Sequence, residues 1–437
     1  MEKSSRLLEL LRFLRDPHLV ARFQHICGVR GTFSGGGGGE AEPSEAHNNG
    51  ACYHQLDAEE TGTVRKRTAG LKNSPHNGSL PAGVAEHSGA TTDGAGEAGT
   101  VKPLRRNSLT GDAGQEFRVE NRFLYYLFTF GTELGNEFFY ITFFPFLLWN
   151  VDAFVSRRLI MVWVWVMYLG QCTKDVFRWS RPASPPVVKV EMFYNSEYSM
   201  PSTHAMSGTA IPFALFFMTC GRWEYSVTLG YVLAFCWCLL VCVSRIYMGM
   251  HSVLDVIVGV IYSVVILLVL LPALDAIDHF VLTCAYAPLV IVSLHLSLGL
   301  FSFTLDTWST SRGDTAQILG SGAGVALASH VNHRLGLMPD PLPGRLPLSL
   351  PALSGDLVGT AALRFLLGVL ILVATRALMK ALTISLVCRI LAIPGDDVRK
   401  ARQHMEVELP YRYIVYGTVG FNVLFLVPLI FSYLPHC

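Results

Sequence analysis

The feature that most constrains the fold is a series of long apolar stretches, which runs from about Phe123 to the C-terminus. A helix needs about 20 apolar residues to cross the hydrocarbon core of a bilayer. Only 15% of the 437 residues are charged, whereas soluble domains carry about 25%. We therefore predict an all-α fold, a polytopic transmembrane helical bundle of about 8–10 spans. The candidate spans are 122–149, 155–172, 204–220, 225–244, 252–272, 283–303, 314–332, 357–378 and 411–433.

The N-terminal part of the chain has a different composition. Residues 1–30 carry leucines near helical spacing among arginines, which predicts an amphipathic helix that lies on a membrane surface or binds a partner. Residues 31–115 contain few large apolar side chains, which predicts a disordered linker. Within it, Ser108 follows two arginines and an asparagine, as in basic-directed kinase sites, and is a candidate phosphorylation site. Residues 116–437 form the predicted transmembrane domain, with a catalytic core at 170–260.

Three clusters of polar residues interrupt the apolar sequence, each beside a predicted span. The first contains Lys174 and Arg181, the second is 201–204, and the third extends from Ser244 to Asp255. The chain makes two crossings between the second cluster and the third. All three clusters should therefore lie at one face of the membrane, where they can converge.

The cations of these clusters predict a phosphate site. Lys174, Arg181 and Arg245 would repel one another in a poorly hydrated setting unless an anion joined them, and guanidinium groups fit phosphate oxygens well. Ser202 and Thr203 lie where a helix begins, and free backbone N–H groups there favour an anion. Simple N-capping explains the same two residues, and both interpretations can hold together.

Two histidines and one carboxylate complete a catalytic hypothesis. His251 and Asp255 are four residues apart, so on a helix Asp255 would hydrogen-bond one imidazole nitrogen and leave the other free to attack phosphorus. His204, from another helix, would protonate the leaving alkoxide and later deprotonate water.

Two classes of partner are not expected. The net charge of +1 gives no indication of nucleic-acid binding. A site for a divalent metal would need several close carboxylates, and beside Asp255 the clusters offer only Asp175 and the outlying Glu191 and Glu197. We therefore predict that no metal and no other cofactor is required.

The three clusters resemble the signature of the type 2 phosphatidic acid phosphatase superfamily, which includes lipid phosphate phosphatases. Lys174 to Pro182 reads K-x6-R-P, Pro201 to His204 reads P-S-x-H, and Ser244 to Asp255 reads S-R-x5-H-x3-D. Segments 171–188, 193–212, 301–324 and 401–413 are also similar to the sphingosine-1-phosphate phosphatases. The Gly-rich N-terminal segment with its RRNSLTG resembles the type 1 branch of that subfamily more than type 2.

The resemblance implies a function as well as a fold. The chain would hydrolyse sphingosine 1-phosphate, and its dihydro and phyto analogues, to sphingoid base and phosphate through a covalent phosphohistidine, and so regulate sphingolipid balance. His251 would be the nucleophile, Asp255 would orient it, and His204 would be the acid and base. The location would be the endoplasmic reticulum membrane, with the catalytic site on the luminal side.

Further expectations concern the lipid and the topology. Glu133 or Glu137 would bind the sphingoid amine, and the loop with Tyr194 and Tyr198 would cover the headgroup. If two spans precede the first cluster, the N-terminus shares the catalytic face, and a luminal site would keep Ser108 from cytosolic kinases.

Alternatives for the function come from the same superfamily and from other classes. They are a phosphatase for glucose 6-phosphate or a polyprenyl diphosphate, a membrane scaffold without activity, and a lipid transporter. A scaffold would be expected to lack catalytic positions, whereas His204, His251 and Asp255 are all present.

Overall fold

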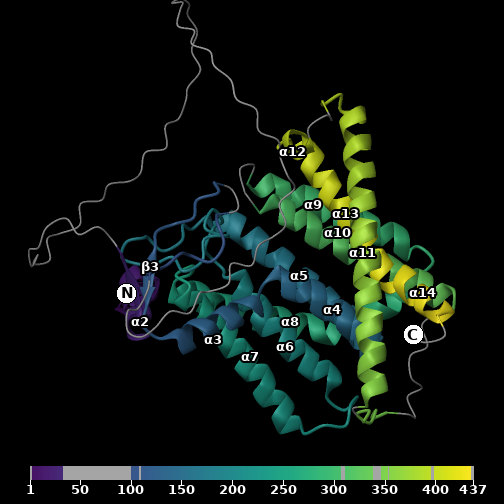
Figure 1. The fold of residues 1–437 in the computed structure, drawn as a ribbon, viewed down its shortest axis with the longest axis horizontal. Coiled ribbons are helices and arrows are strands. Elements are labelled where there is room, and N and C mark those ends of the chain that lie inside the picture. Colours follow the sequence, from purple (N-terminus) through teal and green to yellow (C-terminus); the bar gives the residue numbers. More distant parts are fainter. Residues whose placement is uncertain are drawn as a thin grey trace, which may run out of the picture. The chain divides into compact units, whose positions relative to one another are not determined.

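The computed structural model describes residues 2–32, 100–107, 110–306, 311–337, 346–352, 354–394 and 398–434, which belong to one compact unit. Helices predominate (Figure 1). They are α1 (Glu2–Arg15), α2 (Pro17–Ile26), α3 (Arg122–Glu133), α4 (Glu137–Asn150), α5 (Ala153–Phe177), α6 (Thr203–Thr219), α7 (Val227–Tyr247), α8 (Val253–Thr283), α9 (Ala287–Leu305), α10 (Arg312–Arg334), α11 (Gly355–Ile390), α12 (Val398–Ala401), α13 (Met405–Leu424) and α14 (Leu426–Tyr433). The strands are β1 (Val29–Gly31), β2 (Thr100–Val101) and β3 (Phe117–Val119).

The predicted helical membrane bundle is confirmed. Among the described residues, six helical segments are long and apolar enough to cross a bilayer: α5, α7, α8, α9, α11 and the segment Met405–Tyr433. Much of their surface remains exposed apolar side chains, as at Leu268 and Leu370. A face of this kind is stable against lipid tails rather than against water.

Three of the nine predicted spans differ from simple membrane helices. The stretch 122–149 is two helices, α3 and α4, which are separated at Leu134 to Asn136, beside the charged Glu133 and Glu137. Helix α6 has only 17 residues and is buried along most of its length. Helix α10 is rich in glycine and alanine and lies largely inside the protein. Neighbouring helices, rather than lipid, therefore surround α6 and α10.

Helices α5 to α8 form the bundle that holds the three polar clusters (Figure 1). Their apolar core joins Leu159 and Val162 of α5 to Met206 and Ile211 of α6. Each helix begins at a polar N-cap whose side-chain oxygen accepts a backbone N–H, which satisfies a donor that the helix itself cannot pair. The caps are Asp152, Ser202, Ser226 and Ser252.

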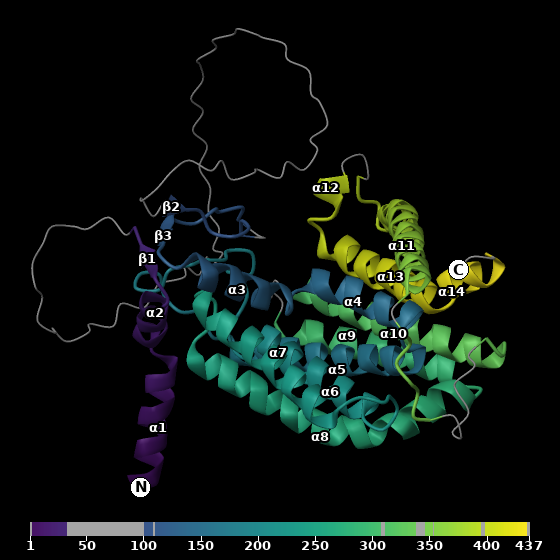
Figure 2. The same cartoon turned by 60° about the horizontal axis from the view of Figure 1, so that its bottom comes forward.

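Helices of the second half pack closely through small residues. A side chain at Gly320 or Gly324 of α10 would collide with backbone atoms of α13, so these positions need glycine. Small residues four apart allow two membrane helices to approach at backbone distance. Figure 2 shows α11 alongside α13 and α14.

The N-terminal prediction needs correction. Residues 1–30 contain two helices, α1 and α2, because Asp16 caps a second helix that starts at Pro17. Residues 33–99 and 108–109 lie outside the described residues, and with them the candidate site Ser108. Part of the predicted linker is structured instead: β1, β3 and β2 form an antiparallel sheet in that order, and Leu104 exchanges backbone hydrogen bonds with Val190 and Met192.

Gln24 of α2 fastens the N-terminal region to the loops of the polar clusters. Its Nε2 donates to the carbonyls of Val188 (2.7 Å) and Tyr247 (2.8 Å), and its Oε1 accepts from the N–H of Val188 (3.0 Å). The side chain is 1% exposed, so water cannot replace these bonds. The N-terminal helices are therefore part of the support of the site.

Replacing Gln24 with alanine should lower the free energy of unfolding by about 1–3 kcal/mol, because buried backbone groups would lose their partners. Thermal unfolding of the detergent-solubilised protein measures this loss. The neighbouring exposed Arg22 provides a matched control, since Arg22→Ala removes no such bond. Equal unfolding temperatures for the two variants would contradict this role of Gln24.

Candidate functional site

Hydrogen bonds between loops bring the three clusters together at one end of α5 to α8. The N–H of Ser202 donates to the carbonyl of Asp255 (3.2 Å), and the N–H of Val190 donates to that of Met248 (3.1 Å). The turn after α7 requires Gly249, which has a φ of +70° and lies against the carbonyl of Val188. A larger residue would be strained there and would displace the turn that carries the third cluster.

His251 lies at the centre of the site but not on a helix. It precedes Ser252, the N-cap of α8, so the expectation of a shared helical face with Asp255 is wrong. The imidazole is 1% exposed, and its Nε2 lies 3.1 Å from Nη1 of Arg181. Because a guanidinium can only donate, Nε2 carries the lone pair and Nδ1 carries the proton.

Asp255 is connected to His251 through a third side chain, that of Ser199. The distance from Nδ1 of His251 to Oδ2 of Asp255 is 3.9 Å, too long for the direct hydrogen bond that the sequence predicted. The hydroxyl of Ser199 lies between them, 3.4 Å from Nδ1, and donates to Oδ2 of Asp255 at 2.6 Å. Sequence analysis missed Ser199; its only signal was a hydroxyl two residues before the second cluster. The backbone N–H of Ser252 also donates to Asp255 (2.8 Å).

The surroundings keep His251 neutral. Burial, followed by the positive charges of Arg181, Arg245 and Lys174, holds the pKa of His251 well below its ordinary value of 6.5. A neutral imidazole keeps its lone pair near pH 7. The site thus places an imidazole nitrogen with a lone pair beside positive charges, an arrangement suited to attack on a phosphate.

The guanidinium of Arg245 has N–H groups that no other described residue accepts from. It is fully buried, and its Nη1 donates to Oε2 of Glu191 at 2.9 Å. Its Nε and Nη2 have no partner in the described part of the chain. Buried N–H groups without partners are costly. An oxyanion that accepts from Nε and Nη2 would remove this cost.

Two glutamates that looked peripheral in the sequence lie among the cations. Glu191 joins Arg245 to Arg105, whose Nη1 is 4.0 Å from Oε1. Glu197 pairs with Lys174, with 2.9 Å between Nζ and Oε2, and lies 3.9 Å from Nη2 of Arg181. The cations therefore do not need a bound anion to coexist, which corrects the prediction that they would simply repel one another.

The second cluster begins α6. Ser202 is the N-cap and accepts from the N–H of Ala205 at 3.4 Å, and Thr203 is the first residue of the helix. His204 follows, with Nε2 3.0 Å from Oδ1 of Asn136, and the ring of Tyr194 packs against it at 5.1 Å. Asn136, at the break between α3 and α4, is a second site residue that sequence analysis missed.

Three of the four expected lipid contacts, Glu133, Glu137 and Tyr198, pair with other residues of the protein. Both oxygens of Glu133 accept from Arg105 (2.6 and 2.9 Å), and Glu137 accepts from Gln317. The hydroxyl of Tyr198 donates to Asp306 at 2.7 Å, which anchors the loop before α6 to the end of α9. Each predicted carboxylate therefore has a partner other than the predicted phosphate-binding cations.

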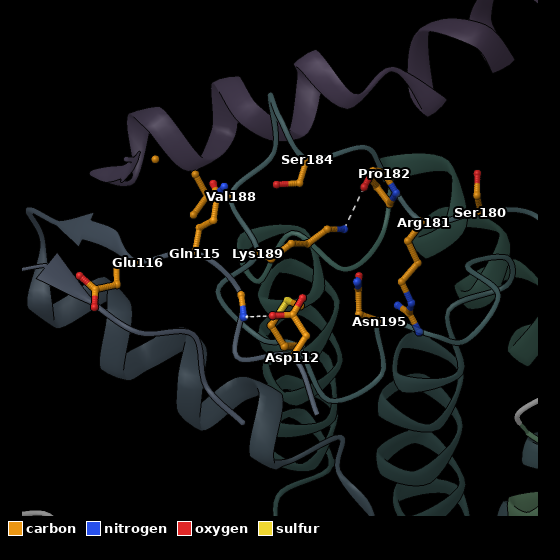
Figure 3. A pocket seen from close by; sticks show the side chains of 13 residues that line it. Asp112, Gln115, Glu116, Ser180, Arg181, Pro182, Ser184, Val188, Lys189 and Asn195 are labelled. Carbon is orange, nitrogen blue, oxygen red and sulfur yellow. Dashed lines mark hydrogen bonds between the residues drawn. The ribbon is translucent and has the colours of Figure 1, made fainter. Parts of the chain in front are cut away.

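A pocket of about 470 Å³ opens beside Arg181. Figure 3 shows Arg181, Asn195 and Lys189 on its lining, with Asp112 facing them. Lys189 donates to the carbonyls of Pro182 (2.9 Å) and Gly249 (2.8 Å), which ties the first cluster to the third. Burial and the charge of Arg181 lower the pKa of Lys189 to about 7. The pocket connects polar surface to the guanidinium that contacts His251.

The chain is similar in sequence to proteins of a known phosphatase family. Residues 157–277 match the model of the PAP2 superfamily. The chain is 54% identical to sphingosine-1-phosphate phosphatase 1 of Rattus norvegicus, over 99% of each chain. It is 36% identical to sphingosine-1-phosphate phosphatase 2 of Homo sapiens, over 98% of this chain and 99% of the relative. No solved structure matches. The chain therefore belongs to the sphingosine-1-phosphate phosphatase family of the PAP2 superfamily.

Proposed function

We propose that the protein hydrolyses sphingosine 1-phosphate and related sphingoid-base phosphates through a covalent phosphohistidine, without a metal. One observation carries the mechanism: Nε2 of the buried, neutral His251 lies among the side chains of Arg181, Arg245 and Lys174. The substrate class follows from the relatives, which align with this chain over nearly their full length and are named sphingosine-1-phosphate phosphatases. Through this reaction the enzyme adjusts the balance between sphingoid bases and their phosphates.

In the first step, Nε2 of His251 attacks phosphorus and the bond from phosphorus to the ester oxygen breaks. The proton on Nδ1 remains in the hydrogen-bonded chain through Ser199 to Asp255, which stabilises the positive charge that the ring acquires. The bound dianionic phosphate offsets the positive charges of Arg245 and Lys174 around His204 and so favours its protonated form. Protonated His204 gives its proton to the departing oxygen, so that the sphingoid base leaves as an alcohol. Arg181, Arg245, Lys174 and the N-terminus of α6 at Ser202 and Thr203 hold the phosphoryl oxygens.

In the second step, water attacks the phosphorus of the phosphohistidine and the bond from phosphorus to Nε2 breaks. The now neutral His204 takes the proton from water, and His251 regains its lone pair. The pocket beside Arg181 gives water and released phosphate a polar route to this centre. The lipid tail remains on the bilayer side of the helices.

The positive side chains take the place that a metal holds in other phosphatases. A phosphoryl transition state needs its negative charge neutralised, and fixed guanidinium groups do this without any ion. Glu191 and Glu197 are already paired with cations, which favours their use in holding those side chains over ligation of a metal. Metal independence is therefore part of the proposal.

We further propose an endoplasmic reticulum location with a luminal site, as the family resemblance implies. The segment before α3 contacts Val190 at the catalytic end, whereas Asp152, after α4, binds Arg222 at the opposite end. Helices α3 and α4 together therefore make one crossing, and the N-terminal region shares the catalytic side. On this topology a luminal site leaves Ser108 out of reach of cytosolic kinases.

Brief incubation with ³²P-labelled sphingosine 1-phosphate should attach label to the wild-type protein. The bond should be stable in alkali and labile in acid, as expected of a phosphoramidate. His251→Ala should abolish the label and the turnover, whereas His333→Ala, a change of an exposed histidine, should alter neither. Label that persists in His251→Ala would overturn the assigned nucleophile.

Replacing Ser199 with alanine should lower kcat roughly 10- to 100-fold with little change in KM, because a hydrogen bond to a charged group is worth about 1.5–3 kcal/mol. Steady-state kinetics of the purified protein test this. Ser196→Ala removes a similar hydroxyl that instead bonds Asn107, and it should have little effect on kcat. A Ser199→Ala enzyme with normal kcat would exclude Ser199 from orienting His251.

Phosphate release in EDTA should equal release without it, since only protein side chains are proposed to stabilise the transition state. The wild-type protein should hydrolyse sphingosine 1-phosphate faster than lysophosphatidate and glucose 6-phosphate. Loss of activity in EDTA that a divalent ion restores would refute the metal-free mechanism. Preference for another of the three phosphates would refute the substrate assignment and leave the chemistry intact.

A further inference from the structure

We propose that Glu197 recognises the ammonium group of the substrate, by exchanging its partner Lys174 for that ammonium when the phosphate binds. The inference rests on the proposed function, because it concerns how that site selects a sphingoid phosphate. It assigns substrate selection to a loop residue between α5 and α6, in place of the predicted Glu133 and Glu137.

The carboxylate of Glu197 lies where a bound phosphate would replace it. Its Oε2 is 2.9 Å from Nζ of Lys174 and 3.9 Å from Nη2 of Arg181, two cations that are expected to hold the phosphate. The pair is secluded, since the Lys174 side chain is 2% exposed and that of Glu197 10% exposed. A dianionic phosphate that takes these two cations must displace the single carboxylate from them.

The backbone keeps Glu197 at the site after such a displacement. Nε of Arg181 donates to the carbonyl oxygen of Glu197 at 3.0 Å, and Tyr198 is anchored to Asp306. The carboxylate can therefore rotate away from Lys174 but cannot leave the neighbourhood of the phosphate. A displaced carboxylate in a poorly hydrated site needs a new cation, because a buried unpaired charge is costly.

A sphingoid phosphate supplies that cation at the required place. Its ammonium group is on the carbon next to the one that bears the phosphate ester, so both charges enter the site together. A glycerol-based lysophosphatidate has a hydroxyl in place of the ammonium and would leave Glu197 without a partner. Sites that leave a buried polar group unpaired with the wrong substrate discriminate strongly against it.

Other nearby carboxylates are less suited to this role. Glu191 is 1% exposed and bridges Arg245 and Arg105, so its release would dismantle a buried network. Glu133 is held by both of its oxygens, Glu137 is bonded to Gln317, and Asp314 is paired with Arg412. Each of these pairs can persist while phosphate is bound, whereas the pair of Glu197 with Lys174 uses a predicted phosphate ligand.

Two soluble headgroup probes test the proposal: O-phosphoethanolamine, which carries the ammonium, and ethyl phosphate, which lacks it. Each is titrated against the thermal unfolding of the full-length protein in detergent, so that the affinities do not depend on turnover. The wild-type protein should bind O-phosphoethanolamine roughly tenfold more tightly than ethyl phosphate. Glu197→Gln should bind the two probes with equal affinity. Glu133→Gln, the matched control, changes a carboxylate that pairs with Arg105 and should keep the wild-type preference.

Several outcomes would overturn the proposal. Equal affinities for the two probes in the wild-type protein would do so before any variant is made. A Glu197→Gln protein that still prefers O-phosphoethanolamine would show that Glu197 does not recognise the ammonium. A variant that binds both probes equally weakly would show that Glu197 only positions Lys174. Failure of the wild-type protein to hydrolyse sphingosine 1-phosphate would instead refute the proposed function, whatever the probes show.

Discussion

The structure of the site depends on the pairing of buried cations with carboxylates at one end of the helix bundle. Lys174 and Arg245 are almost completely buried, and each is held by a glutamate of the loop between α5 and α6. Without Glu197 and Glu191, these cations would be buried without a partner, which costs stability. The pairs therefore hold the proposed phosphate site together without a bound anion.

This constraint explains why so much of the chain converges on a few loops. The turn at Gly249 positions the third cluster. Lys189 connects this turn to the first cluster, and the turn lies against the loop that is hydrogen-bonded to Gln24. Arg105, from the segment before α3, continues the network by pairing with Glu133 and Glu191. Regions far apart in sequence thus act as one support for His251.

The sequence predicted the architecture well because a membrane-spanning helix requires a long run of apolar residues, which is easily recognised. Most helices lie at the positions of these runs. It failed at α3 and α4, where Asn136 and its charged neighbours break an otherwise apolar stretch. It also placed disorder over residues 100–107, because this segment is held by backbone hydrogen bonds between Leu104 and the distant Val190 and Met192 rather than by a core of its own. Local composition carries no information about such a distant partner.

For the site, the sequence by itself determined which groups are proposed to react: their spacing beside the ends of spans predicted His204, His251 and the three cations, and the structure brings them together. Tertiary structure alone decided how they are connected. Ser199 stands between His251 and Asp255, Asn136 contacts His204, and Glu197 lies on Lys174. The physical reason is that the residue types needed for chemistry are few and recognisable. A serine, an asparagine or a glutamate in a loop acquires its role only from the side chains that folding brings within hydrogen-bonding distance.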